Sequence, residues 1–171
     1  ICKLYLHEAT RVYGDRMVNQ TDVSKFEEIV AKHVKTHLGT PELGLDQEAL
    51  NAEPNLFANF VTEDDAKFYL PFTKGWDQLS GILENKLAEY NDTFAQMNLV
   101  LFNQAMEHVS RISRIIDNPR GNAMLVGVGG SGKQSLTRLA AFIGGCEVFQ
   151  IKLTSSYGIA DFKDDLRAMY M

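Results

Sequence analysis

The strongest pattern in the sequence is the stretch Gly127-Val128-Gly129-Gly130-Ser131-Gly132-Lys133-Gln134-Ser135. A glycine, four further residues and then Gly132-Lys133 have the spacing of a phosphate-binding loop. The apolar run Ala123–Val128 lacks alternation and predicts a strand buried on both faces, and the pattern after the loop predicts a helix over Lys133–Ile143. A strand before the loop and a helix after it are the context that this motif requires.

The chemistry of the loop follows from its residue types. Glycines permit backbone conformations that a Cβ disfavours, so successive N–H groups can turn inward around a phosphate. A helix that begins near Lys133 directs the positive end of its dipole to the same place, and the lysine adds a full charge. The loop therefore predicts binding of a nucleotide polyphosphate, against the alternative of a glycine-rich turn that binds nothing.

One position departs from the phosphate-loop pattern. Gln134 stands where a Ser or Thr hydroxyl would coordinate Mg²⁺, and Ser135 follows one residue later. Because a helix turns about 100° per residue, Ser135 points away from that position, whereas the Gln134 amide oxygen can reach an ion directly or through a water. The pattern therefore favours nucleotide binding over hydrolysis.

The sequence offers few other candidates for chemistry. Hydrolysis requires an acidic pair after the loop and an arginine for the γ-phosphate, and neither is found. The acidic run Glu63-Asp64-Asp65 precedes the loop and is interpreted as the solvated start of a helix. His33 and His37 are four residues apart, as in a zinc pair, but no third ligand accompanies them. We predict no catalytic residue and no metal ligand.

Two more histidines and two arginines lie on predicted helices. His7 and His108 stand beside apolar positions and are interpreted as packing or hydrogen-bonded residues. For Arg111 and Arg114 two interpretations stay open: they face a nucleotide or a neighbouring module, or they belong to a solvated helix face.

Helical periodicity dominates the chain before the loop. Two antiparallel helices are predicted, one over residues 2–18 and one from a cap at Thr21 or Asp22 to Gly39. Two further helices are predicted over residues 76–97 and 99–116.

After the loop, a second strand over Val148–Ile151 and a helix from Ile159 complete a strand-helix-strand unit, which opens an α/β domain with a parallel sheet. Three segments are expected: a helical segment 1–38, a linker 39–75 and a truncated domain 76–171. The chain begins without an initiator methionine, and its last periodic segment reaches its end, so we expect an excerpt of a longer polypeptide.

Composition excludes several classes of protein. With 45% hydrophobic and 23% charged residues, the chain can form a core. Its 17 basic and 22 acidic residues give a net charge of -5, which predicts no nucleic-acid partner. The longest apolar run, Leu139–Ile143, predicts no membrane association, and the N-terminus has no signal-peptide pattern. Cys2 and Cys146 have neither metal-ligand nor disulfide spacing, which fits a reducing compartment inside the cell.

Three stretches resemble one protein family. Gly121–Ala140 closely resembles the phosphate loop of the fourth AAA+ module of axonemal dynein heavy chains, where glutamine is typical at the position of Gln134. Met97–Phe102, followed by Arg111–Arg114, resembles the helices that lead into that module. Leu6–Arg16 resembles the helical lid of the third module. The three stretches occur in the family's order.

The resemblance implies a helix-rich α/β fold, with a lid segment and a linker followed by the truncated start of a parallel-sheet AAA+ domain. It implies a regulatory ATP or ADP site, where Gln134 would weaken Mg²⁺ binding. The residues that would hold the nucleotide, carried over by position, are Gly127, Gly129, Gly130, Ser131, Gly132, Lys133, Gln134 and Ser135.

For the parent protein, the resemblance implies an ATP-driven motor that steps toward microtubule minus ends and bends cilia and flagella. The implied partners are adjacent AAA+ modules, dynein intermediate and light chains, and microtubules, and the implied location is the cytoplasm and the axonemal cytoskeleton. A free-standing P-loop nucleotide kinase or NTPase, and a structural scaffold with a vestigial loop, are the alternatives. Without catalytic acidic residues, the fragment is not expected to be active alone.

Overall fold

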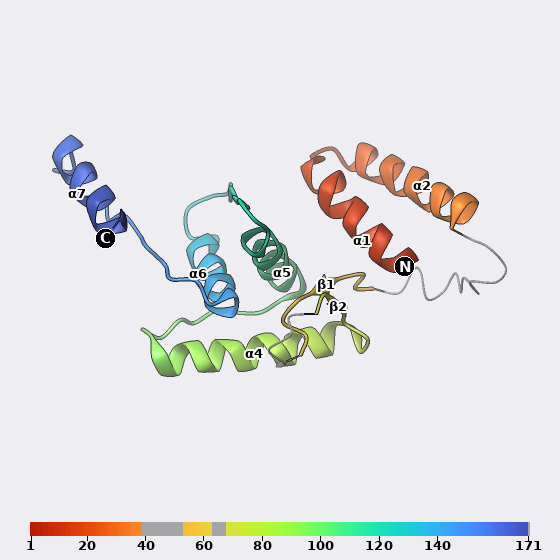
Figure 1. Cartoon of the computed structure of the whole chain (residues 1–171), viewed down its shortest axis with the longest axis horizontal. Coiled ribbons are helices and arrows are strands. Elements are labelled where there is room, and N and C mark those ends of the chain that lie inside the picture. The colour runs from red at the N-terminus through yellow and green to blue at the C-terminus, as the bar shows by residue number, and fades with distance from the viewer. Residues whose placement is uncertain (39–52, 63–67, 171) are drawn as a thin grey trace.

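The computed structural model describes residues 1–38, 53–62 and 68–170. Its elements are α1 (Cys2–Val12), the 3-10 turn η1 (Gly14–Arg16), α2 (Gln20–His37), β1 (Phe57–Ala58), β2 (Leu70–Pro71), α4 (Gly75–Thr93), α5 (Asn103–Asp117), α6 (Lys133–Gly144) and α7 (Ile159–Tyr170). Helices α4, α5 and α6 lie together beside the α1–α2 pair, and α7 stands apart from both groups (Figure 1). None of the described helices combines the length and the apolar character needed to cross a membrane.

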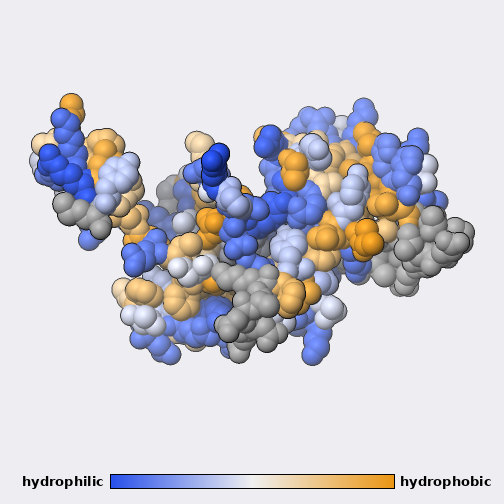
Figure 2. Space-filling model, viewed as in Figure 1, coloured by the Kyte–Doolittle hydropathy of each residue, from blue (hydrophilic) through white to orange (hydrophobic). Residues whose placement is uncertain are grey.

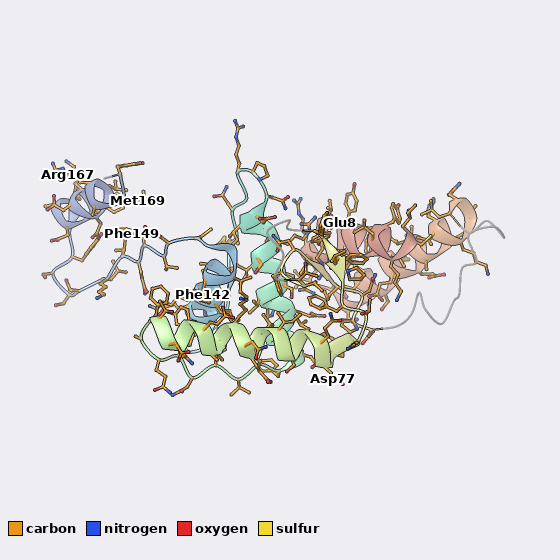
Figure 3. The ribbon with its side chains drawn as sticks, turned by 60° about the horizontal axis from the view of Figure 1, so that its bottom comes forward. Glu8, Asp77, Phe142, Phe149, Arg167 and Met169 are labelled. Carbon is orange, nitrogen blue, oxygen red and sulfur yellow. The ribbon has the colours of Figure 1, made fainter. Side chains whose placement is uncertain are left out.

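The core lies where α6 packs on α5 and α4 lies against both. Leu83 of α4, Val109 of α5 and Leu139 of α6 are completely buried. At one end of this core, Phe142 of α6 meets Tyr90 of α4 edge-on with ring centroids 5.5 Å apart, and Figure 3 shows Phe142 beside α4. Burial of these apolar side chains is the main driving force that holds α6 in place, and with it the loop that precedes α6.

The helices of the core begin and end at partly different residues from those predicted. The predicted helix 76–97 ends at Thr93, and the predicted helix 99–116 begins at Asn103. The side chain of Asn91 explains the early end, because its Oδ1 accepts a hydrogen bond from the Met97 N–H (2.8 Å) and its Nδ2 donates to the Met97 carbonyl (3.3 Å). These bonds hold the chain in a turn that a continuing helix would not allow.

Helices α6 and α7 begin at Lys133 and Ile159, as predicted. α7 is amphipathic but has no buried residue. In Figure 2 its lobe shows orange apolar atoms beside blue polar ones, and in Figure 3 Met169 and Arg167 project from this isolated helix.

The predicted parallel sheet is not formed within the described residues. The runs 123–128 and 148–151 are not strands there, and the sheet that is present joins β1 and β2 in antiparallel register. Val126 and Val128 are 84% and 79% exposed, although the apolar pattern predicted a doubly buried strand. A strand exists through pairing with a neighbour, and no described segment pairs with either run.

The described part of the expected linker 39–75 contributes to the core. Leu56, Ala58 and Phe72 belong to the same buried cluster as the helices, and β1 contacts α5. Residues 39–52 and 63–67 of that segment lie outside the described residues. Apolar burial therefore continues through a segment whose proline and glycine content predicted a linker.

The first two helices form the expected antiparallel pair (Figure 1). The first is shorter than predicted, since α1 ends at Val12 and the turn η1 follows. The cap of α2 is Asn19, two residues before the earliest predicted position, and its Oδ1 accepts a hydrogen bond from the Thr21 N–H at 2.9 Å. Asn19 has extended backbone dihedrals, which lets its short side chain accept a hydrogen bond from the first turn of α2.

Charged side chains join α1 and η1 to α5. Arg114 of α5 pairs with Glu8 of α1, which Figure 3 labels, and Arg111 of α5 lies 3.7 Å from Asp15 of η1. Burial alone would raise the pKa of Glu8, but the Arg114 guanidinium lowers it overall. These two pairs, here called the α1–α5 ion pairs, place the N-terminal helices against the wall of the core.

His7 links α1 to both sides of the β1–β2 hairpin. Its Nδ1 lies 2.9 Å from the Asn55 carbonyl oxygen, which can only accept, so Nδ1 donates. Its Nε2 then accepts a hydrogen bond from the Tyr69 hydroxyl at 2.6 Å. The ring is 2% exposed, and burial lowers the pKa of His7 to about 4, despite the opposing effect of the Asn55 carbonyl. The interpretation of His7 as a hydrogen-bonded packing residue is confirmed.

This arrangement predicts a dependence of stability on acid. Because the pKa of His7 is lower in the folded chain than in the unfolded chain, its stabilising effect is complete above about pH 6.5 and is lost as the pH falls toward 4, by roughly 3 kcal/mol in total. Urea unfolding between pH 4 and 7 should show a shallower decline for His7→Gln than for the unmutated chain. The exposed His37, changed to Gln, is the matched control and should keep the original slope. Equal slopes in all three proteins would contradict the assignment.

Candidate phosphate-binding site

The predicted phosphate loop runs from Gly127 to the first turn of α6. Gly130 and Gly132 have φ of +77° and +76°, the left-handed region that favours glycine. At Gly127 a Cβ would lie 3.2 Å from the Ser131 Oγ, which would have to shift by a few tenths of an ångström, and at an ordinary contact distance of 3.6 Å from the Lys133 Nζ. The positions of these glycines are therefore explained by the conformation of the loop itself.

The Lys133 side chain folds back over the loop. Its Nζ donates to the carbonyl oxygens of Gly127 (2.9 Å) and Val128 (2.6 Å) and to the Ser131 hydroxyl (3.0 Å). These three acceptors hold the ammonium at the N-terminus of α6, where Gly132 is the cap residue. A full positive charge and the positive end of the helix dipole thus coincide, and together they attract an anion.

A cavity of about 920 Å³ opens beside the loop. Five of the eight predicted nucleotide-binding residues line it: Gly127, Gly130, Ser131, Gly132 and Lys133. The other residues in its wall come from the segment before α5, from α5, from the run before the loop, from α6 and from η1: Leu99, Val100, Phe102, Gln104, Ala105, His108, Met124, Leu125, Val126, Val128, Leu136 and Asp15. The wall is largely apolar, as in pockets that hold small organic ligands.

The other three predicted residues do not line this cavity. Gln134 is exposed and lines a neighbouring cavity of about 240 Å³, into which Lys133 also extends. Gly129 and Ser135 line neither of these two cavities. At position 134, where the phosphate-loop pattern would supply a Ser or Thr hydroxyl for Mg²⁺, α6 has the amide side chain of Gln134.

The structure also places the remaining sequence candidates. Arg114 pairs with Glu8 of α1, and Arg111 lies near Asp15 of η1 and donates to Glu107 of α5. Both arginines thus face the N-terminal segment, which agrees with the interpretation that they face a neighbouring module. His108 is exposed and lines the cavity, so its interpretation as a packing residue is wrong. Gln104 and His108 are four residues apart and so share one face of the predicted helix. This spacing could have predicted that both side chains line the same cavity.

The His33 and His37 rings stack with centroids 5.5 Å apart on an exposed face of α2. Within the described ranges, no group of three or more His, Cys, Asp or Glu side chains is placed to hold a metal ion. The acidic residues 63–65 lie outside those ranges.

Two stretches of the chain match known protein families. Residues 97–171 match the family model described as P-loop containing dynein motor region D4, and residues 1–45 match an AAA+ lid domain. The chain is 49% identical over 169 residues to the ciliary dynein beta chain of Heliocidaris crassispina. It is 48% identical over 174 residues to the dynein beta chain of the flagellar outer arm of Chlamydomonas reinhardtii, and 46% identical over 171 residues to dynein axonemal heavy chain 17 of Homo sapiens. These alignments cover 99%, 99% and 100% of this chain but 4% of each relative.

The loop geometry predicts a contrast between two glycines. Gly132→Ala should destabilise the chain by about 1–2 kcal/mol, because alanine disfavours a φ of +76°. Gly129→Ala is the matched control, since the φ of Gly129 is not positive and a Cβ there meets open space, as at Gly132. Denaturant unfolding measures both effects. A loss of stability as large for Gly129→Ala as for Gly132→Ala would contradict the described loop conformation.

Proposed function

The chain is a homologue of axonemal dynein heavy chains over nearly its whole length, and we propose that its phosphate loop binds ATP or ADP in the fourth AAA+ module of such a motor. The observation that carries this proposal is the position of the Lys133 ammonium over the loop, at the N-terminus of α6 and in the wall of a 920 Å³ cavity. Anion-binding groups and a largely apolar wall are both needed for a ligand with a polyphosphate and a base.

The residues of the loop fit a polyphosphate. A Cβ at Gly127 would press on the Ser131 hydroxyl, and the left-handed Gly130 and Gly132 let the backbone pass close to a ligand. In the proposed complex, loop N–H groups and Lys133 bind the phosphates, with Gly129, Ser131, Gln134 and Ser135 completing the nucleotide-binding stretch. Leu99, Val100 and Phe102 line the same cavity and offer apolar surface to the nucleoside.

The role of magnesium in this proposal is limited. Mg²⁺ would supply charge neutralisation between phosphate oxygens when bound. The exposed Gln134 side chain offers one amide oxygen in place of the usual hydroxyl. We therefore propose a regulatory nucleotide site in which the metal contributes less to affinity than in a loop with Ser or Thr.

The same homology supports a proposal for the segments of the chain. We propose that residues 1–38 are the lid of the third AAA+ module, 39–75 the linker and 76–171 the first part of the fourth module. The chain spans 4% of the length of the relatives described above, so the activity of the whole protein is part of the proposal. The proposed activity is ATP-driven, minus-end-directed movement along microtubules in a cilium or flagellum. Dynein intermediate and light chains are its proposed partners.

The two alternatives have less support. A free-standing nucleotide kinase or NTPase does not account for the lid match over residues 1–45 or for the dynein match over residues 97–171. A scaffold with a vestigial loop does not account for the three acceptors that position Lys133 beside a cavity.

The first test of this function removes the charge of the loop. Lys133→Ala should raise the Kd for ATP and for ADP by about 100-fold, because several charge-assisted hydrogen bonds to phosphate are lost together. Isothermal titration calorimetry on the full chain measures the change. Lys163→Ala, in the exposed helix α7, is the matched control and should bind like the unmutated chain. An unchanged Kd for Lys133→Ala would refute the proposal.

The second test concerns the metal. Gln134→Thr restores a hydroxyl at the usual ligand position, so Mg²⁺ should strengthen ATP binding by a larger factor in this variant than in the unmutated chain. Gln134→Ala removes the amide without supplying a hydroxyl and should not gain this dependence. ATP titrations with and without Mg²⁺ compare the three proteins, and identical metal dependence in all of them would exclude a weakened magnesium site.

A further inference from the structure

The cavity beside the phosphate loop has two charged side chains in its wall. Among the described residues that line it, Lys133 contributes a positive charge and Asp15 of η1 a negative one. Lys133 is held over the loop by backbone carbonyls, whereas Asp15 comes from η1, beside α5. A ligand with an anionic end is therefore attracted toward the Lys133 end of the cavity.

Two arginines lie within ion-pair distance of the Asp15 carboxylate. Its Oδ2 lies 3.1 Å from the Arg11 Nε, and its Oδ1 lies 3.7 Å from the Arg111 Nη2. The Arg11 side chain is 8% exposed, so the carboxylate is paired with a buried guanidinium. A carboxylate oxygen can accept more than one hydrogen bond, so acceptor capacity remains toward the cavity.

The rest of the wall near Asp15 suits the uncharged part of a nucleotide. Leu99, Val100 and Phe102 are apolar, and Phe102 precedes α5 with 56% of its surface exposed. Gln104 and His108 add uncharged or weakly basic hydrogen-bonding groups along α5. A base can lie against such a wall while its polar edge, or its ribose, meets the polar groups.

We propose that Asp15 determines the orientation and the nucleoside specificity of this pocket, by accepting a hydrogen bond from a donor group of the nucleoside. The proposal rests on the proposed function, since it needs a nucleotide whose phosphates lie at Lys133. The donor is a ribose hydroxyl or the exocyclic amino group of the base. A residue of the N-terminal segment, more than one hundred positions before the loop, thereby forms part of its ligand site.

The test compares ATP with inorganic tripolyphosphate, which has the phosphates but no nucleoside. In the full chain, Asp15→Asn should raise the Kd for ATP about tenfold, the effect of losing a charge-assisted hydrogen bond, and should not weaken tripolyphosphate binding. Glu8→Gln is the matched control, because it breaks the other α1–α5 ion pair without lining the cavity. It should leave the ratio of the two Kd values unchanged.

Nucleotide analogues test the same contact without any mutation. If the donor is a ribose hydroxyl, 2′-deoxyATP or 3′-deoxyATP should bind the unmutated chain about tenfold more weakly than ATP. If the donor is the amino group, inosine triphosphate should show this loss instead. The analogue that binds weakly to the unmutated chain should lose nothing further in Asp15→Asn.

Three outcomes would overturn the inference. The first is an unchanged ratio of ATP to tripolyphosphate affinity in Asp15→Asn together with equal binding of all analogues. The second is an equal change in Glu8→Gln, which would assign the effect to the contact between α1 and α5. The third is the absence of binding of both ATP and tripolyphosphate to the unmutated chain, which would overturn the proposed function itself.

Discussion

The packing of α6 on α5 is the contact on which the site depends. Val109 and Leu139 are completely buried in it, and α4 covers the two helices with Leu79 and Leu83. α6 begins at the lysine of the phosphate loop, and α5 supplies the facing wall of the cavity. The apolar contact between α5 and α6 thus sets the distance between the anion-binding groups of the loop and the wall that α5 supplies. Among the described residues, no ion pair joins α5 to α6.

The N-terminal helices are attached by a different kind of interaction. Hydrogen bonds of His7 join α1 to the hairpin, and the α1–α5 ion pairs join α1 and η1 to the core. Through Asp15 this attachment reaches the wall of the nucleotide cavity. The segment that matches a lid and the segment that matches a P-loop region are therefore in contact at the site itself, and not merely consecutive in the chain.

The sequence was most informative where a local pattern determines the structure. The start of α6 at Lys133 and the special conformation of Gly130 and Gly132 follow from a motif that spans nine residues. The end of α4 was not predictable from apolar spacing, because one side chain, Asn91, bonds to the backbone six residues later. The place of Asp15 in the cavity was not predictable either, since it depends on tertiary packing. The apolar run 123–128 met the pattern of a buried strand, but pairing with another strand is not encoded in the run itself.

The α1–α5 ion pairs respond to the solvent differently from the core. Both pairs are partly exposed, so mobile ions can screen them, and the Debye length falls from about 10 Å at 0.1 M salt to about 3 Å at 1 M. The α5–α6 contact is apolar and gains strength from salting-out ions such as sulfate. Higher ionic strength therefore weakens the ion pairs that attach the N-terminal helices to α5. The same salt strengthens the apolar contact between α5 and α6 that forms the core.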